Sequence, residues 1–308
     1  MRITATKDNA NWVIDDIISD FKANTKHTMV DLNDNPDIIW FGSFWGFKND
    51  YGNMVKVCPF ALKLFQIHHI ETTKLNEYPF KELNRADGCI VCNKKTKEEV
   101  EKHLSIPVTQ LPYWVIAKRT APSLCDKVAR LRDGFKDSSD QLLIGSFQKD
   151  SVYNTNRPKL CKGPDIFLQV IKKLNEIRKI KVVLGGYSRK YLIDNFEKLN
   201  IPYVYLERYK DINSLYDCLD WYLVTSRIEG GPQAVLESAY RKVKVLSTDV
   251  GVASEILHPD CICGGVEEFV GKMIDNVDKT EDNYRNVCEN YIVEKAIPVW
   301  DAFFGRSK

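Results

Sequence analysis

The sequence predicts an α/β protein with two Rossmann-like, doubly wound domains, each built on a parallel sheet that helices cover on both faces. Short apolar runs typical of strands alternate with longer amphipathic runs typical of helices along most of the chain. This alternation is interrupted once, near the middle. The chain has 308 residues, which is too long for one ordinary domain and suits two.

The expected strands are short apolar runs in two series. The first series comprises residues 2–6, 27–32, 37–44, 62–69, 88–93 and 107–111, and the second comprises 142–147, 181–186, 203–206, 221–226 and 243–248. Amphipathic helices are expected between them, for example at 167–179 and 188–200. In the first of these helices, apolar residues recur at steps of three and four, which places them on one face.

The interruption sets the domain boundaries. Lys, Arg, Pro, Ser and Asp are frequent between residues 115 and 140, where we also expect a helix. We therefore predict a first domain at 1–118, a linker at 119–140, a second domain at 141–280 and a helical tail at 281–308. The aromatic-rich end of this tail could cross back onto the first domain.

Composition excludes several classes of protein. The net charge is only +2, and residues 1–118 hold 15 basic and 15 acidic side chains, so no nucleic-acid partner is expected. No apolar run is long enough to span a bilayer, and the N-terminus lacks the apolar core of a secretion signal. The nine cysteines are scattered, as is usual for reduced thiols. We expect a cytoplasmic protein.

No metal site is expected. Cys89 and Cys92 are three apart on an expected strand, so they point to opposite faces. Cys261 and Cys263 share a face, but no second pair of ligands at zinc spacing accompanies them. No D-x-D motif follows a strand.

The stretch SRIEGGPQAVLES at 226–238 is the main candidate for a site. It follows an expected buried strand and leads into a helix that we expect from about Pro232 to Tyr240. Ligands of parallel sheets bind beyond the carboxyl ends of strands. Glycines allow a close approach of the backbone, and N–H groups at a helix start attract anions and hydroxyl oxygens. An ordinary junction with an acid near the helix start is the alternative.

These residues resemble a known family. EGGPQAVLE is similar to the E-x7-E motif of retaining glycosyltransferases with the GT-B fold, especially family 4, the glycosyl transferases group 1. KGPDIFLQVIKKL, VVLGG followed by SRKYL, and LSTDVGVASEIL resemble further segments of that family in the same order. Together these four segments cover most of residues 141–265, and the resemblance implies that the second domain binds a nucleotide sugar.

The resemblance implies roles for individual residues. Glu229 would contact hydroxyl groups of the donor sugar and act in catalysis, and Glu237 would hold the ribose of the nucleotide. The backbone of Gly230, Gly231 and Pro232 would line the sugar and the phosphates. A carboxylate is a natural acceptor for sugar hydroxyl groups.

Basic residues are expected around the diphosphate. The resemblance implies that Lys162 neutralises the leaving nucleoside diphosphate, which gains negative charge as it departs. The family often has an arginine near the preceding strand end, where this chain has Ser146 or Phe147. Arg189 is our candidate substitute, against the alternative of a surface residue in a helix's first turn. Weaker candidates are Lys149 and Arg157.

The first domain resembles the family less. The family often has a histidine at a strand end facing the donor sugar, and the expected strand 62–69 ends in His68 and His69. We favour His68 as the catalytic-site histidine, against the alternative of a core histidine with satisfied hydrogen bonds. The family's glycine-rich loop after the first strand is replaced by TKDNANW, so the acceptor is not identified.

The expected function is a retaining, metal-independent glycosyltransferase. Its donor, a nucleoside-diphosphate sugar, would be a co-substrate bound by the second domain, and no cofactor is expected. The acceptor, saccharide or lipid-linked, would bind the first domain, and a peripheral membrane contact is left open. The alternatives are a non-catalytic module that binds nucleotide sugars or glycans, and a GT-B sugar-nucleotide epimerase. The sequence names neither the sugar and base nor the oligomeric state.

Overall fold

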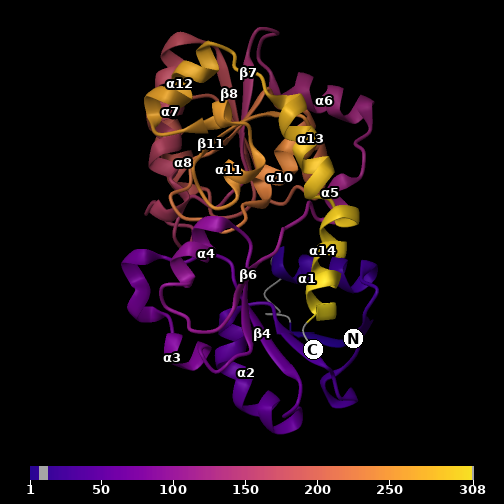
Figure 1. Cartoon of the computed structure of the whole chain (residues 1–308). Coiled ribbons are helices and arrows are strands. Elements are labelled where there is room, and N and C mark those ends of the chain that lie inside the picture. Colours follow the sequence, from indigo (N-terminus) through magenta and orange to yellow (C-terminus); the bar gives the residue numbers. More distant parts are fainter. Residues whose placement is uncertain (7–12, 307–308) are drawn as a thin grey trace. The chain divides into compact units, whose positions relative to one another are not determined.

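The computed structural model describes residues 1–6 and 13–306 (Figure 1). The chain forms two compact units. Unit 1 combines Met1–Ala117 with Glu289–Lys308, and unit 2 is Lys118–Cys288. Among the described residues, every helix is too short or too polar to cross a lipid bilayer.

Unit 1 is built on a parallel sheet of six strands in the order β2-β1-β3-β4-β5-β6. The strands are β1 (Arg2–Thr6), β2 (Thr28–Met29), β3 (Ile38–Phe41), β4 (Leu62–Ile67), β5 (Gly88–Val91) and β6 (Val108–Gln110). The chain starts in β1, adds β2 on one side and places all later strands on the other, so the strand order reverses between β1 and β3. β3 is buried on both faces, as expected for a central parallel strand.

Helices cover this sheet, and the last of them comes from the end of the chain. They are α1 (Val13–Asn24), α2 (Phe44–Val57), α3 (Phe80–Leu83), α4 (Lys94–Val100) and α14 (Val293–Arg306), with 3-10 turns at Leu32–Asp34 and Thr72–Glu77. Figure 1 shows α14 in yellow beside α1 in indigo, and the two helices are in contact. Trp300 of α14 is completely buried against Trp40, Phe21 and Trp114.

Unit 2 is built on a second parallel sheet, in the order β12-β11-β10-β7-β8-β9. The strands are β7 (Leu142–Ser146), β8 (Ile180–Gly185), β9 (Tyr203–Leu206), β10 (Trp221–Val224), β11 (Lys244–Thr248) and β12 (Ile262–Cys263). Counted from β7, this is the 3-2-1-4-5-6 order of dinucleotide-binding folds. The order reverses between β7 and β10.

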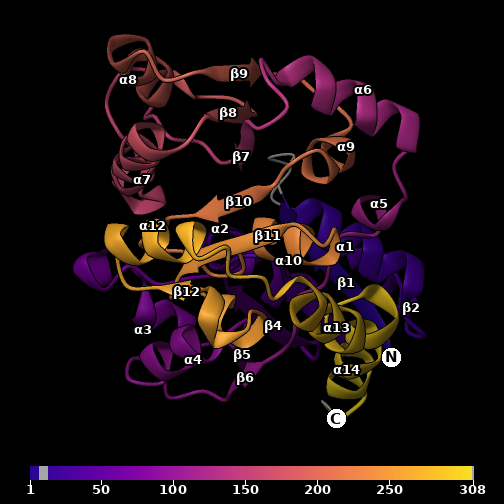
Figure 2. The same ribbon diagram turned by 90° about the horizontal axis from the view of Figure 1, so that it is seen from above.

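The helices of unit 2 pack on both faces of its sheet. They are α6 (Cys125–Phe135), α7 (Pro164–Ile177), α8 (Lys190–Leu199), α9 (Ile212–Asp217), α10 (Gln233–Tyr240), α11 (Ala253–Ile256) and α12 (Val266–Ile274). Figure 2 shows α7 and α12 side by side. Two helices lie at the junctions between the units, α5 (Ala117–Thr120) and α13 (Thr280–Asn290), and 3-10 turns occur at Leu160–Lys162 and Pro259–Cys261.

The structure confirms the predicted fold class, with differences at the ends of elements. The strand expected at 37–44 stops at Phe41, because Ser43 caps α2 by accepting a hydrogen bond from the Gly46 N–H. The strand expected at 62–69 stops at Ile67, so both histidines follow it. Residues 119–140, expected as a linker, contain α6, which packs against α9 inside unit 2. The loop TKDNANW lies outside the described residues after its first threonine.

Candidate functional site

The candidate site lies where the strand order of unit 2 reverses. Ligands of doubly wound sheets bind beyond the carboxyl ends of the strands at this reversal. β7 ends at Ser146, and β10 is followed directly by Thr225 and Ser226. The segments that follow these two strands carry Lys162 and Glu229.

A glycine brings the two segments into close contact. Gly163 has a φ of 60°, and a Cβ at this position would lie 1.7 Å from the Thr225 carbonyl oxygen. The Thr225 hydroxyl donates a 2.9 Å hydrogen bond to the Gly163 carbonyl, and the Arg227 N–H donates one of the same length to the Cys161 carbonyl. The αL glycine also ends the 3-10 turn before Pro164 starts α7.

Lys162 and Glu229 form an ion pair at this junction. The Lys162 ammonium donates to Glu229 Oε1, and the Ser226 hydroxyl lies 3.0 Å from the same oxygen. Gln148 bridges the two segments, because its amide nitrogen donates to the Lys162 carbonyl and its amide oxygen lies 3.1 Å from the Ser226 hydroxyl. The Lys162 side chain is 24% exposed and the Glu229 side chain is 13% exposed, so a ligand can reach both charges.

The Gly-Gly-Pro turn is held from the other side by the segment after β11. The Val252 N–H donates a 3.1 Å hydrogen bond to the Gly230 carbonyl. Gly251 has a φ of 52°, and a Cβ there would lie 2.1 Å from the Gly230 oxygen. Pro232, where the helix was expected to start, is the N-cap of α10, and the helix begins one residue later, at Gln233. The turn between Glu229 and α10 is therefore fixed by a second strand end.

Glu237 has a different environment from Glu229. It lies on α10 and is almost completely buried. Its carboxylate is 3.4 Å from the Arg119 guanidinium of α5. Burial raises the pKa of this carboxyl group, whereas Arg119 and a hydrogen bond with Tyr216 act to lower the pKa. Arg119 was not a predicted site residue, because it is far from Glu237 along the chain and no local pattern links the two.

Arg189 is buried, so the alternative of a surface residue is wrong. Its side chain has no exposed area. One guanidinium nitrogen, Nη2, donates to the Ser146 hydroxyl at 3.1 Å, and Nε lies 2.9 Å from Asp150 Oδ2. Asp150 was not a predicted site residue. Burial raises the pKa of its carboxyl group. Ser146 is buried too. Arg189 therefore holds the carboxyl end of β7 and presents no exposed charge in this conformation.

His68 is held inside unit 1 through both ring nitrogens. Nε2 donates to the Gly42 carbonyl at 2.7 Å, so Nδ1 accepts from the Tyr113 hydroxyl. Burial lowers the pKa of His68 to about 4, so the ring is neutral at physiological pH. This bonding matches the alternative of a satisfied histidine, although the ring also lines a pocket of unit 1. His69 is exposed and lines the same pocket.

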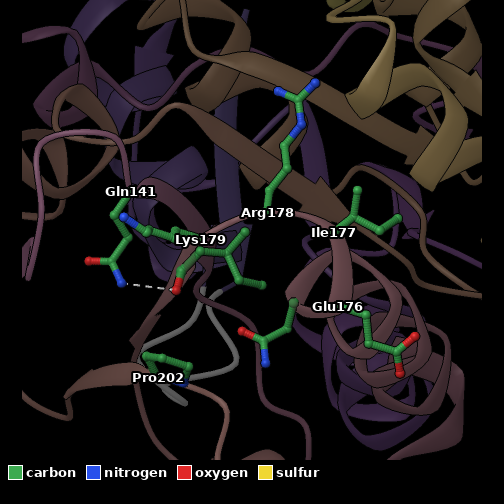
Figure 3. Close-up of a pocket in the computed structure, with 8 residues that line it drawn as sticks. Gln141, Glu176, Ile177, Arg178, Lys179 and Pro202 are labelled. Carbon is green, nitrogen blue, oxygen red and sulfur yellow. Dashed lines mark hydrogen bonds between the residues drawn. The ribbon is translucent and has the colours of Figure 1, made fainter.

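A pocket of unit 2 lies at the opposite edge of its sheet. Figure 3 shows this pocket of about 360 Å³, where the Gln141 amide donates a 3.1 Å hydrogen bond to the Ile180 carbonyl. Gln141 precedes β7 and Ile180 begins β8, so the pocket lies at the amino ends of the strands. It is separate from the Lys162–Glu229 pair. In the part of the chain that the structure describes, no three His, Cys, Asp or Glu side chains are grouped to hold a metal ion.

The two parallel six-stranded sheets belong to the GT-B fold class. The fold resembles HepE from Anabaena in complex with UDP and glucose, with a TM-score of 0.75 and 11% identity over 99% of each chain. A glycosyltransferase from Rickettsia africae gives a TM-score of 0.74 with 13% identity, over 99% of this chain and 98% of that one. A mutant of TarM from S. aureus, in complex with fondaparinux, α-GlcNAc-glycerol and UDP, gives 0.64 with 15% identity, over 87% of this chain and 55% of that one.

One segment of the chain matches a protein family by sequence. Residues 148–284 match the family described as Glycosyl transferases group 1. The matched segment contains Lys162, Arg189, Glu229 and Glu237, and it begins two residues after Ser146. A search of curated protein sequences returned no match.

Proposed function

We propose that the chain is a glycosyltransferase that takes its sugar from a nucleoside-diphosphate donor bound by unit 2. The observation that carries the proposal is the partly exposed Lys162–Glu229 pair, which lies where the strand order reverses and inside the matched family segment. HepE and TarM were each solved with UDP, so a uridine nucleotide is the first donor to test.

The ion pair suggests how the donor would bind. A diphosphate is a stronger partner for an ammonium group than one carboxylate, so it would draw Lys162 away from Glu229. Glu229 would then accept hydrogen bonds from sugar hydroxyl groups, beside the backbone of Gly230 and Gly231. Lys162 would stabilise the charge that develops on the leaving phosphate.

Glu237 is proposed to bind the ribose. The Glu237 carboxylate would accept hydrogen bonds from the two ribose hydroxyl groups, and Arg119, 3.4 Å away, would orient it and oppose the rise in its pKa that burial causes. Arg189 is proposed as a positioning residue that fixes Ser146 beneath the donor. We further propose that transfer retains the anomeric configuration, needs no metal ion, and uses an acceptor bound by unit 1.

Donor turnover with the Glu229→Gln variant tests this function. The amide keeps the size of the side chain but cannot accept as strongly, so we expect release of nucleoside diphosphate from UDP-, GDP-, ADP- and dTDP-sugars to fall at least about 100-fold, while nucleotide affinity changes little. Glu176→Gln, an exposed residue of α7, is the matched control. Wild-type turnover by Glu229→Gln would refute the role of Glu229. Binding without turnover in the wild-type protein would favour a non-catalytic module.

A further inference from the structure

A second pocket lies at the carboxyl edge of the sheet in unit 1. It has a volume of about 200 Å³, and it is lined by the segments that follow β3 and β4 and by Ile14 of α1. Trp45 is the second residue of α2, just after β3, and Glu71 and Tyr78 flank the 3-10 turn after β4. β3 borders the point where the strand order of unit 1 reverses, which is the ligand position in sheets of this kind.

One wall of this pocket is aromatic. Trp45 is 47% exposed although it is a large apolar side chain. Its ring centroid lies 4.6 Å from that of Phe44, which in turn stacks on Tyr78 at 5.2 Å with an interplanar angle of 29°. Pockets that bind small molecules combine such apolar walls with a few convergent polar groups. The C–H face of a sugar ring packs on an exposed indole, while its hydroxyl groups reach outward.

Another part of the lining is polar. The Glu71 carboxylate is 2.7 Å from the Lys74 ammonium, and the Glu71 N–H donates a 3.0 Å hydrogen bond to the Tyr78 hydroxyl. The ion pair with Lys74 holds the Glu71 side chain in place. This side chain is 22% exposed, so a ligand can still reach it. Carboxylates accept hydrogen bonds from hydroxyl groups, and ammonium groups donate to their oxygens.

The charge of the pocket selects between ligand classes. Glu71 and Glu77 are acidic, Lys74 is basic, and His68 is neutral with its Nε2 bonded to the Gly42 carbonyl. The two carboxylates and the one ammonium group of the lining sum to −1, a charge that disfavours phosphate and other anions. An uncharged, polyhydroxylated ring fits both the aromatic wall and the carboxylates.

We infer that this pocket binds a neutral saccharide unit, with Trp45 as the stacking wall and Glu71 as the hydrogen-bond acceptor for its hydroxyl groups. Its role as the acceptor site rests on the function proposed above, whereas saccharide binding does not. The acceptor is therefore recognised through a neutral sugar and not through a lipid phosphate.

Titration of the full-length protein with neutral saccharides tests the inference. Ligand-observed NMR with methyl glucosides, N-acetylglucosamine, cellobiose and maltose should show saturable binding by at least one of them. We expect Trp45→Ala and Glu71→Gln each to weaken its affinity at least about tenfold, because the first removes the stacking surface and the second replaces the carboxylate acceptor with a weaker amide. Phe60→Ala, which removes a 98% exposed aromatic residue outside the pocket, should bind like the wild type.

The outcomes separate this inference from the proposed function. Saccharide binding that depends on Trp45, without UDP binding or turnover, supports the pocket and removes the donor proposal. Absence of saturable binding, or equal affinity in Trp45→Ala, overturns the pocket. Binding to vesicles of phosphatidylcholine and phosphatidylglycerol is measured as well. If the protein binds these vesicles but no saccharide, and Trp45→Ala abolishes the vesicle binding, the saccharide pocket is also overturned.

Discussion

At the scale of single residues, burial determines which charges the protein can use. The Lys162 and Glu229 side chains are partly exposed. The Arg189 side chain has no exposed area, and its guanidinium group contacts Asp150 and Ser146. Both ring nitrogens of His68 are already hydrogen-bonded to groups within unit 1. The residue types alone therefore do not define the site, because the exposure of each side chain decides whether it can contact a ligand.

The neutral state of His68 predicts a loss of stability at acidic pH. Its pKa is lowered to about 4 in the folded protein, against the ordinary value of 6.5 for a histidine side chain. The unfolded chain therefore binds the proton more tightly, and the stability is complete above pH 6.5 and lost progressively as the pH falls towards 4. From pH 7 to pH 5 this group should cost about 2 kcal/mol of the free energy of unfolding.

Urea unfolding at these two pH values measures the effect. Five of the six tryptophans lie in the chain segments of unit 1, so their fluorescence reports mainly on this unit. His68→Gln removes the titrating group, so its midpoint should depend less on pH than that of the wild type. Identical pH dependence in the two proteins would contradict a His68 ring that is neutral in the folded protein.

At the scale of elements, close contacts between segments build the site. Gly163 and Gly251 allow two loops to touch the turn that carries Glu229 and Gly230. The local sequence predicts the elements well, because strand and helix patterns depend on near neighbours. It cannot predict pairs such as Arg119–Glu237 or Asp150–Arg189, because these depend on which segments the fold brings together.

Gly163→Ala should destabilise unit 2 and displace Lys162. The αL backbone disfavours a side chain, and the added methyl group would overlap the Thr225 carbonyl. We expect a loss of about 2 kcal/mol or more, because backbone on both sides must shift. Thermal unfolding, together with the affinity for nucleoside diphosphates, measures both effects.

Gly271→Ala is the matched control for this substitution. Gly271 lies inside α12, where an added Cβ meets nothing within 4 Å, and alanine there should stabilise the helix by about 0.5–1 kcal/mol. Equal stability of the two variants would show that the close approach at Gly163 is not required.

At the scale of the whole molecule, the two units are not simply the first and second halves of the chain. Unit 1 is completed by residues from the C-terminal end, through the packing of α14 on α1. The aromatic-rich end of the tail was expected to cross back onto the first domain, and Trp300 and Phe304 are buried in unit 1. The saccharide pocket could not be read from sequence, because Trp45, Glu71 and Tyr78 belong to no repeated pattern and meet only when β3 and β4 pair.

Trp300→Ala should strongly destabilise unit 1. The side chain has no exposed area and contacts aromatic rings from three other segments, so its removal should cost about 3–5 kcal/mol. Val299→Ala changes the adjacent residue, which is 46% exposed, and should change the unfolding midpoint little. If both variants unfold alike, α14 does not stabilise unit 1 as described.

The most direct test of the central claim is calorimetric titration of UDP, GDP, ADP and dTDP into the wild-type protein and into Lys162→Ala. We expect one nucleotide to bind the wild type and to bind the variant at least about tenfold more weakly, because the variant lacks the cation beside the diphosphate. Lys172→Ala, at an exposed position of α7, should retain the wild-type affinity. Binding of none of the four nucleotides, or equal affinity in Lys162→Ala, would contradict a nucleotide-diphosphate site at the reversal point of unit 2.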